Sequence, residues 1–423
     1  MRLKTAKALA CVALVGSFVV AMLPQVSSAS PVGLSPTSFT SNYSLMFSSA
    51  IQNVVHAMPG WTAAAPGGTK LDIGVVLPDE VSSTRYVEFD APDLTTAFTD
   101  AGLAPAEYNI QNAQGSDATE ITDAQADITN GAKVLLIDPL DSTTGAAIEA
   151  AAAKAGVKVI DYDRLTLGGS RQYYVSFNNV AVGTLIGKGL TACLTAWKIK
   201  KPTVYVMYGA TTDNNATLFG EGYNAVLKAA GFKPGEGAAD SANTINESTG
   251  TWTPSVALTD FEGAYSAHPT INAVITPNDE NAAPIISYLQ GKGLKPDKIP
   301  FTGQDATLTG FDNILQGYQC GTVYKPIWLE AQAAATLAFY LAAGKTPPAS
   351  LINGTTSDTG ATPKVAVPSV LLKPSWVTAN LIQSTVIKDN VISPVALCTP
   401  QKPTVKGFKA PTYASLCKKY KIS

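Results

Sequence analysis

Residues 133–164 read KVLLIDPLDSTTGAAIEAAAAKAGVKVIDYDR, with two short apolar runs on either side of an alanine-rich stretch. The runs have the length and the Val and Ile content of buried strands, and the middle has the composition of a helix. Two such strands joined by a helix form a parallel βαβ unit. The same alternation begins earlier, at LDIGVVLP (71–78), and continues later, at PTVYVMYG (202–209) and INAVITP (271–277). The sequence therefore predicts an α/β fold with parallel sheets covered by helices.

The number of predicted strands favours two similar doubly wound lobes over one sheet of nine or more strands. Length agrees with this, because roughly 390 residues are left after the N-terminal segment is removed, enough for two domains.

The N-terminal segment, residues 1–29, has the layout of a secretory signal peptide: three basic residues, an apolar run and small residues before Ala29. We expect cleavage after Ala29 and export to the periplasm or to the cell surface. An uncleaved membrane anchor is the alternative. Residues 30–69 are rich in Ser, Thr, Pro and Gly, with one helical stretch at 45–58, and are interpreted as an extension or linker.

The formal net charge is −2 and only 15% of the residues are charged, so no global field favours nucleic acid or an anionic membrane. The C-terminal segment, 397–423, differs because it carries six lysines and no acid. We expect a solvated tail, with contact to a negatively charged partner as the alternative. Without Cys11 four cysteines are left, which fits an exported chain. A bridge between Cys398 and Cys417 is plausible, but the connectivity is open.

Polar residues follow the predicted strands, where ligands bind in open parallel sheets. Carboxylates, amides and fixed cations recur there, and Trp252 adds an aromatic face. A carboxylate accepts from two neighbouring hydroxyls and a cation or amide donates to the same oxygens, so this set suits a polyhydroxylated ligand. Helix capping is the alternative role, expected of Asn214 or Thr212. The residues at the strand ends are Asp79, Arg85, Tyr86, Asp163, Arg164, Asp213, Asn215, Asn278, Asp279, Gln304, Asp305 and Lys325.

The sequence has few of the side-chain combinations that enzyme catalysis requires. His56 and His268 are the only histidines in the sequence, and neither is near a nucleophile or in metal-ligand spacing. Arg164 and Lys325 should keep nearby carboxylates ionised, which suits binding better than general acid catalysis. We expect no catalytic residue, no metal and no cofactor.

Seven stretches together resemble the xylose-binding branch of the periplasmic pentose and hexose binding proteins, the solute receptors of bacterial ABC sugar importers. The resemblance runs from about residue 71 to residue 396 and leaves residues 30–69 and the lysine-rich tail unexplained. The stretches are STRY, DYDRL, YGATTDNNATLF, TPNDENAA, TGQDATLTGF, TVYKP and STVIKD.

This resemblance implies the type I periplasmic binding protein fold, in which the chain crosses between the lobes three times. It assigns 70–178 and 326–365 to one lobe, and 179–325 and 366–396 to the other. It also implies a monomer that holds one monosaccharide, xylose first and glucose or another aldose next, and delivers it to an ABC permease. The implied ligand residues are Arg85, Tyr86, Asp163, Arg164, Asp213, Asn215, Trp252, Asn278, Asp305 and Lys325.

Tyr86 stands where the family often has a larger aromatic residue, so the choice between pentose and hexose is open. Two other functions are open as well. One is a secreted carbohydrate-active enzyme with a carboxylate pair. The other is a sugar receptor for a chemotaxis or sensor system, which would use the same site.

Overall fold

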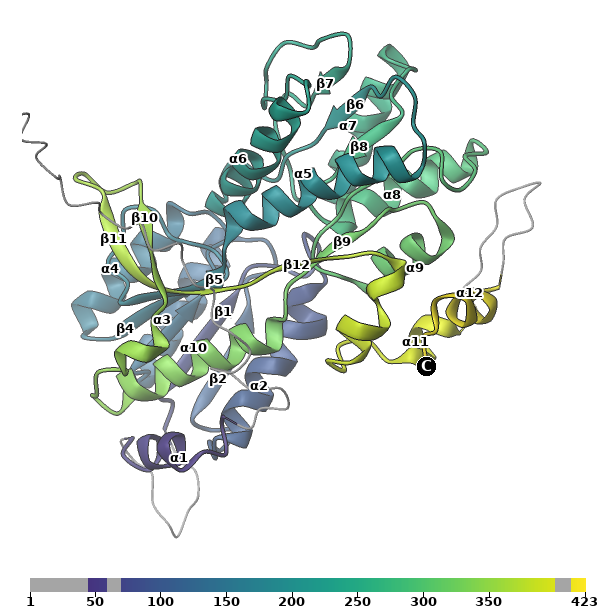
Figure 1. Cartoon of the computed structure of the whole chain (residues 1–423). Coiled ribbons are helices and arrows are strands. Elements are labelled where there is room, and N and C mark those ends of the chain that lie inside the picture. Colours follow the sequence, from purple (N-terminus) through teal and green to yellow (C-terminus); the bar gives the residue numbers. More distant parts are fainter. Residues whose placement is uncertain (1–44, 59–69, 400–411) are drawn as a thin grey trace, which may run out of the picture. The chain divides into compact units, whose positions relative to one another are not determined.

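The computed structural model describes residues 45–58, 70–399 and 412–423, which belong to one compact unit. From β1 (Ile73–Leu77) to α10 (Ile327–Ala342), strands alternate with helices as the apolar runs predict, except that β5 follows β4 directly and α9 follows α8 directly (Figure 1). Among the described residues, no helix combines the length and the apolar composition needed to cross a bilayer. The expected export segment, residues 1–29, lies outside these ranges, so its cleavage stays a prediction.

A seven-stranded sheet organises the first lobe, in the order β10-β11-β5-β4-β3-β1-β2. Neighbouring strands are parallel except β10 and β11. β1 and β3 are buried along their whole length, because helices cover both faces of the sheet. The strands are β1 (Ile73–Leu77), β2 (Tyr108–Asn112), β3 (Val134–Ile137), β4 (Lys158–Tyr162), β5 (Tyr173–Phe177), β10 (Gly354–Asp358) and β11 (Val365–Leu372).

Two helical layers cover the faces of this sheet. In β3, Val134 and Leu136 join the apolar cluster of α2 and α10, while Leu135 and Ile137 join that of α3 and α4. This alternation follows from the two-residue repeat of side chains along a strand. The helices are α2 (Ala91–Asp100), α3 (Asp117–Asn130), α4 (Thr144–Ala155) and α10 (Ile327–Ala342), with short helical turns at η2 (Tyr86–Asp90) and η3 (Ala349–Leu351).

The helix expected in residues 45–58 is present as α1 (Ser49–Val55), but it is not part of a linker. Ile51, Val54 and Val55 are buried in the same cluster as α10, at the i, i+3, i+4 spacing of an apolar helix face. Gln52 Nε2 also donates to the Ala101 carbonyl at 3.0 Å. The described part, 45–58, is therefore packed against the first lobe, so it is not a linker.

The second lobe has a smaller parallel sheet, β7-β6-β8. Single parallel bridges, Val274 with Phe301 and Gln304 with Val323, continue it toward β9, which pairs antiparallel with β12. Its elements are β6 (Val204–Val206), β7 (Thr244–Asn246), β8 (Ala273–Ile275), β9 (Thr322–Tyr324), β12 (Ser375–Val377), α5 (Asn179–Ala196), α6 (Asn214–Ala229), α7 (Pro254–Ala267), α8 (Asp279–Gly291), α9 (Leu308–Gln316), η4 (Ala379–Leu381) and η5 (Gln383–Ile387).

The chain crosses between the lobes three times: between β5 and α5, between β9 and α10, and between β11 and β12. The third crossing lies later than expected. Residues 369–372 of β11 pair in parallel with β5, so residues 366–372 belong to the first lobe and their assignment to the second lobe is wrong. The cause is that β11 completes the backbone hydrogen bonds along β5, a pairing between residues distant in the sequence.

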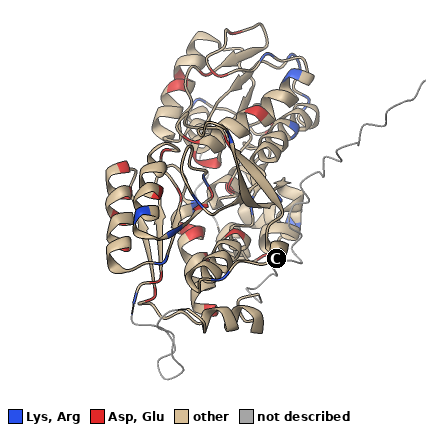
Figure 2. Cartoon of the chain, turned by 90° about the vertical axis from the view of Figure 1, so that its left-hand side faces the viewer, with Lys and Arg blue, Asp and Glu red and all other residues tan. Residues whose placement is uncertain are grey.

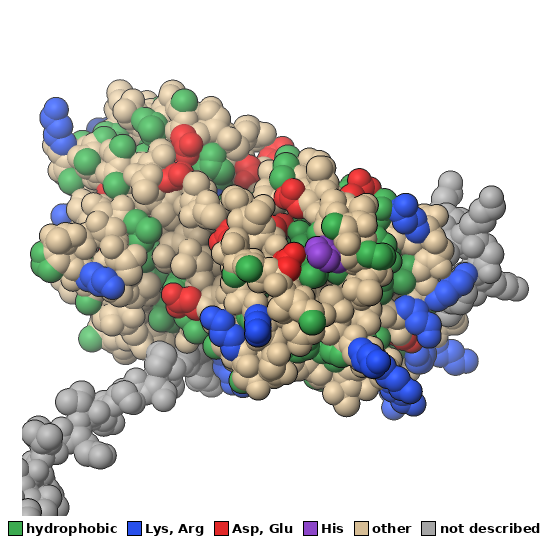
Figure 3. Space-filling model, turned by 90° about the horizontal axis from the view of Figure 1, so that it is seen from above, with side chains coloured by type: hydrophobic (Ala, Val, Ile, Leu, Met, Phe, Trp, Pro, Cys, Tyr) green, Lys and Arg blue, Asp and Glu red, His purple; other side chains and the backbone are tan. Residues whose placement is uncertain are grey.

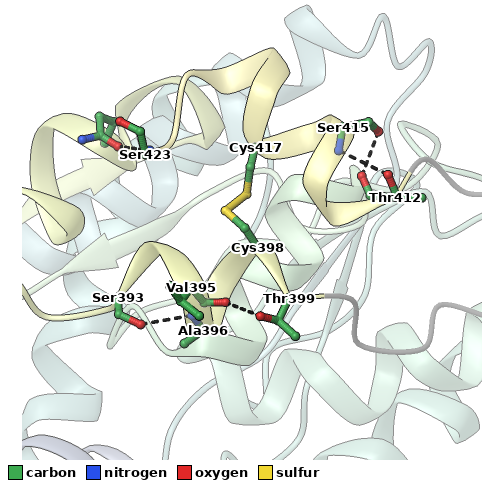
Figure 4. Close-up of a disulfide and its surroundings, with 10 residues drawn as sticks. Ser393, Val395, Ala396, Cys398, Thr399, Thr412, Ser415, Cys417 and Ser423 are labelled. Carbon is green, nitrogen blue, oxygen red and sulfur yellow. Dashed lines mark hydrogen bonds between the residues drawn. A yellow bond between two sulfur atoms is a disulfide. The ribbon is translucent and has the colours of Figure 1, made fainter.

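The described C-terminal residues are folded onto the second lobe. α12 (Tyr413–Tyr420) buries Tyr413 and Leu416 in the apolar cluster around α9. Figure 4 shows the disulfide from Cys417 to Cys398, at the end of α11 (Pro394–Cys398). The expectation of a solvated tail is therefore wrong for 412–423, while residues 400–411 lie outside the described ranges. A second disulfide joins Cys193 of α5 to Cys320 before β9, which settles the connectivity that the sequence left open.

Candidate functional site

One cavity brings together all ten residues that the family resemblance implies as ligand residues. In this structure its volume is about 20 Å³, room for about one water molecule, and its walls come from both lobes. Most of its residues follow the carboxyl ends of strands, where an open parallel sheet leaves room for a ligand. The lining residues are Ser82, Ser83, Arg85, Tyr86, Asp163, Arg164, Asp213, Asn215, Phe219, Trp252, Asn278, Gln304, Asp305 and Lys325.

Arg85 and Tyr86 stand where the loop after β1 turns into η2. Arg85 Nη1 donates to Asp163 Oδ1 at 2.7 Å, and Tyr86 Oη donates to Asp163 Oδ2 at 3.3 Å. The Tyr86 ring also contacts two guanidinium groups, because those of Arg85 and Arg164 lie 5.4 and 5.6 Å from its centroid. This loop therefore supplies one cation and one aromatic wall.

The turn after β4 is fixed through the backbone of Asp163. This residue has a φ of 56°, in the left-handed region that Asp adopts more readily than most residues. Its carbonyl oxygen accepts hydrogen bonds from Tyr174 Oη at 2.8 Å, Ser176 Oγ at 2.7 Å and Asn215 Nδ2 at 2.9 Å. Asn215 belongs to the second lobe, so the same carbonyl also connects the lobes.

Asp213 has two roles at the start of α6. It is the N-cap, since its Oδ1 accepts from the Asn215 backbone N–H at 2.8 Å, and the expectation that Asn214 or Thr212 caps this helix is wrong. Its Oδ2 lies 3.3 Å from Arg164 Nε across the cavity. A single carboxylate thus stabilises the helix and lines the site.

Trp252 and Phe219 form the aromatic wall of the second lobe. Trp252 Nε1 donates to Asp213 Oδ2 at 3.0 Å, and its ring meets Phe219 edge to face with centroids 6.4 Å apart. Gly209 makes room for this ring, because a Cβ there would come within 2.2 Å of Trp252 Cζ2. A larger residue at 209 would therefore displace the wall.

Asn278, Asp305 and Lys325 complete the second-lobe side. Asn278 caps α8 and donates from Nδ2 to the Ser82 carbonyl of the first lobe at 3.0 Å. Lys325 Nζ lies 2.9 Å from Asp305 Oδ1 and 3.8 Å from Asp163 Oδ1. Asp305 Oδ2 accepts from Ser83 Oγ at 3.2 Å. Lys325 therefore stands between a carboxylate of each lobe.

The charges that line the cavity balance. Three cations (Arg85, Arg164 and Lys325) meet three carboxylates (Asp163, Asp213 and Asp305). Figure 2 shows charged positions of both signs distributed over the rest of the chain. On the face in Figure 3, acidic side chains lie mostly toward the middle and basic ones toward the edges.

The cations do not act equally on the carboxylates. Burial opposes ionisation of Asp163, but Arg85 and Lys325 outweigh it and lower its pKa to about 2. For Asp213, burial raises the pKa above its ordinary value, and Arg164 offsets this only in part. The expectation that the cations keep nearby carboxylates ionised thus describes Asp163 better than Asp213.

Several lining residues had a weak sequence signal. Ser82 and Ser83 precede Arg85 in one loop, and Phe219 lies one helical turn after Asn215. The i, i+4 spacing of Asn215 and Phe219 was the signal available for the aromatic residue, because it places both on one face of α6.

Two other carboxylates at strand ends do not line the cavity. Asp79 Oδ1 accepts from the Val81 backbone N–H at 2.6 Å, and Asp279 Oδ2 accepts from that of Thr307 at 2.9 Å. Each therefore fixes a loop. In the part of the chain that the structure describes, no group of three or more His, Cys, Asp or Glu side chains is arranged to hold a metal ion.

Comparison with known proteins gives the family. The profile named periplasmic binding protein domain matches residues 73–346. The chain belongs to this family. It is a family of binding proteins rather than enzymes, and its fold is the type I periplasmic binding protein fold.

Members of the family with known ligands are similar over most of their length. The D-xylose-binding periplasmic protein of Escherichia coli (strain K12) is 35% identical over 67% of this chain and 81% of its own. The multiple sugar-binding periplasmic receptor of Rhizobium radiobacter is 30% identical over 78% of this chain and 92% of its own. A solved carbohydrate transporter solute binding protein of Chloroflexus aurantiacus, in complex with D-glucose, is 27% identical with a TM-score of 0.66 and covers 77% of this chain and 98% of its own.

Proposed function

We propose that this chain captures one neutral monosaccharide in the cavity and delivers it to an ABC importer in the membrane. The observation that carries the proposal is the set of six charged side chains in the cavity, three of each sign, contributed by both lobes. D-xylose is the first candidate ligand and D-glucose the second, because family members similar to this chain are named for or solved with these sugars.

The cavity favours an uncharged ligand with many hydroxyls. Its own cations and carboxylates already pair with one another, so a ligand with a full charge would leave one cavity charge without a partner. Sugar hydroxyls both donate and accept, so they can bind a carboxylate and a cation together. The volume of about 20 Å³ is too small for a sugar ring, so the cavity walls must move apart to admit the ligand before the lobes close on it.

Closure of the two lobes on the sugar is the mechanism we infer. The first lobe supplies Asp163 and Arg164, and the second supplies Asp305 and Asn278. Either set alone offers part of the hydrogen bonds that a sugar needs, and a sugar bound to both sets stabilises the closed arrangement. The three crossings between the lobes are the segments that would turn.

Calorimetric titration of two cavity variants tests the site. Asp305→Ala and Arg164→Ala should each weaken binding of the best sugar by about 2 kcal/mol or more, roughly thirtyfold, because each leaves a buried charged partner unpaired. Asp358→Ala is the matched control, a buried carboxylate paired with Arg171 away from the cavity. Unchanged affinity in both cavity variants would exclude this cavity as the sugar site.

Delivery to an importer needs a separate test. The Rhizobium radiobacter relative is named a receptor, so a sensing role shares the same site. Sugar uptake by vesicles that contain the permease and its ATPase should require this protein. If uptake is independent of it while the protein binds the sugar, the sensing role is favoured.

A further inference from the structure

Arg85 makes most of its hydrogen bonds away from the cavity. Its Nε donates to Asp90 Oδ2 at 2.8 Å, and its Nη2 donates to Asp90 Oδ1 at 2.6 Å and to Glu330 Oε2 at 2.8 Å. Nη1 donates to Asp163 Oδ1 at 2.7 Å. A guanidinium has five N–H groups, so one N–H on Nη1 is left for a ligand.

Neither Asp90 nor Glu330 lines the cavity, and both are fully buried. Asp90 is itself held in place, since Tyr162 Oη donates to its Oδ1 at 2.6 Å. Glu330 Oε2 binds Arg85, while its buried Oε1 has no hydrogen-bond partner. An unpaired buried oxygen destabilises the fold, so packing alone does not explain a glutamate here.

Glu330 also has a particular place in the chain. It lies in the first turn of α10, directly after the second crossing, and Lys325 lies at the other end of that crossing. Lys325 approaches Asp163 to 3.8 Å, and Asp163 binds Arg85. Lys325 and Glu330 lie at the two ends of the second crossing. Lys325 approaches Asp163 and Glu330 binds Arg85, so both act on the Asp163–Arg85 pair.

We propose that Asp90 and Glu330 are positioning residues for sugar binding, which hold Arg85 so that its Nη1 and the Asp163 carboxylate face the cavity. This rests on the proposed function. Through its hydrogen bond to Arg85, Glu330 connects the Arg85–Asp163 pair to the second crossing, which would turn when the lobes close. The sugar affinity thus depends on a carboxylate that never touches the sugar.

The physical reason is competition for Arg85. With Glu330 in place, the N–H groups of Arg85 are divided among Asp90, Asp163 and Glu330. Burial raises the pKa of Glu330 above its ordinary value and Arg85 opposes this, so the feature that Glu330→Gln weakens is the hydrogen bond to Arg85 rather than a full charge. When Arg85 loses this acceptor, it interacts more strongly with Asp163, which then has less capacity to accept from sugar hydroxyls. We expect about tenfold weaker binding, the lower end of the effect known for residues that orient metal ligands from outside the site.

Calorimetry on Glu330→Gln and Glu149→Gln tests the proposal. Glu149 is the matched control, because it is also a fully buried carboxylate paired with a buried arginine, Arg171 at 3.1 Å, but lies away from the cavity. We expect about tenfold weaker binding of the best sugar in Glu330→Gln and wild-type affinity in Glu149→Gln. Equal affinity in both, or an equal loss in both, would overturn the proposal.

Two further variants show whether Glu330 acts through Arg85. In an Arg85→Lys background, Glu330→Gln should weaken binding no further, whereas an additive loss would mean that Glu330 acts by another route. Should Glu330→Gln fail to fold, Tyr162→Phe keeps the proposal testable, because it removes one bond to Asp90 with little change in packing. It should weaken binding two- to threefold, and wild-type affinity would count against the proposal.

The outcome also separates this inference from the proposed function. If the wild-type chain binds none of the sugars, both are wrong. If the wild-type chain binds a sugar and Glu330→Gln binds it equally well, only the inference about the positioning residues is wrong.

Discussion

Two buried arginine clusters in the first lobe have the same chemistry and different surroundings. The Arg85 cluster consists of Arg85, Asp90, Asp163 and Glu330, and the Arg171 cluster consists of Arg171, Glu149, Asp161 and Asp358. Two neighbouring residues of strand β4 contact the two clusters. Tyr162 binds Asp90 of the Arg85 cluster, and Asp161 lies 3.5 Å from Arg171. Adjacent residues of a strand point to opposite faces, so one strand can hold a cluster on each side.

The clusters differ in how completely the protein satisfies their oxygens. Asp358 accepts from the backbone N–H groups of Gly168 and Gly360, both at 2.9 Å, as well as from Arg171. Asp163 accepts from Arg85 and, at 3.3 Å, from Tyr86, and its carboxylate lines the cavity. Asp163 therefore keeps acceptor capacity at a strand end, which supports the proposal that the Arg85 cluster, and not the Arg171 cluster, binds the ligand.

Removal of either arginine should give the largest effect. Arg85→Met and Arg171→Met each remove the arginine that pairs with three buried carboxylates, so each should lower the free energy of unfolding by about 3–5 kcal/mol in urea titrations. We expect the two variants to differ in how their melting temperatures respond to the best sugar. Sugar should raise the melting temperature of Arg171→Met and not that of Arg85→Met. A similar rise in both variants would show that Arg85 has no part in binding.

A pair of carboxylate variants should separate the clusters by affinity. Asp163→Asn should weaken sugar binding by about 2 kcal/mol or more, because a charge-assisted hydrogen-bond acceptor is lost from the cavity wall. Asp358→Asn should leave the affinity unchanged while it lowers stability. Isothermal titration calorimetry of both variants measures the sugar affinity. An equal loss of affinity in Asp358→Asn and Asp163→Asn would contradict the proposal that only the Arg85 cluster takes part in binding.

Acid should remove a contribution of Asp163 to stability. Its pKa is about 2 in the folded chain and about 3.9 in an unfolded one, so the contribution is complete above pH 5 and is lost as the pH falls toward 2. This contribution amounts to about 2–3 kcal/mol. Urea unfolding at pH 5 and pH 3 should show a smaller loss for Asp163→Asn than for the wild type. Identical losses would mean that Asp163 is not held ionised by Arg85 and Lys325.

The smallest effects should come from hydroxyl groups at the edges of the clusters. Tyr86→Phe removes the 3.3 Å bond to Asp163, and Thr166→Val removes a 3.1 Å bond to Asp161. Each should change the free energy of unfolding by about 1 kcal/mol. We expect Tyr86→Phe to change the sugar affinity by less than fivefold and Thr166→Val to leave it unchanged. A larger change of affinity in Thr166→Val would mean that the Arg171 cluster also acts on the cavity.

Local patterns in the sequence predicted the parallel sheets and most of the cavity residues, but not Ser82, Ser83 or Phe219. The runs at β1, β3 and β4 are apolar along their length because both faces are covered, and that composition is visible without a structure. The cavity residues follow strand ends, so the strand pattern also gives their position.

Contacts between distant residues were the part that the sequence did not predict. Glu330 lies 245 residues from Arg85 and inside a helix, where no strand end points to it. The pairing of β11 with β5 and the burial of α1 likewise depend on partners far along the chain. Apolar runs show that a segment is buried, but they do not show against which element it is buried.

A thermal-shift panel on the wild-type chain tests the neutral-sugar site most directly. The panel holds xylose, glucose, ribose, arabinose and galactose, with an aldonic acid and a sugar phosphate as charged comparisons. A ligand that binds the folded chain raises its melting temperature. We predict a rise with at least one neutral sugar, xylose or glucose first, that is absent in Asp163→Asn and kept in Asp358→Asn. No rise with any neutral sugar, or a larger rise with a charged one, would contradict the assignment of this cavity.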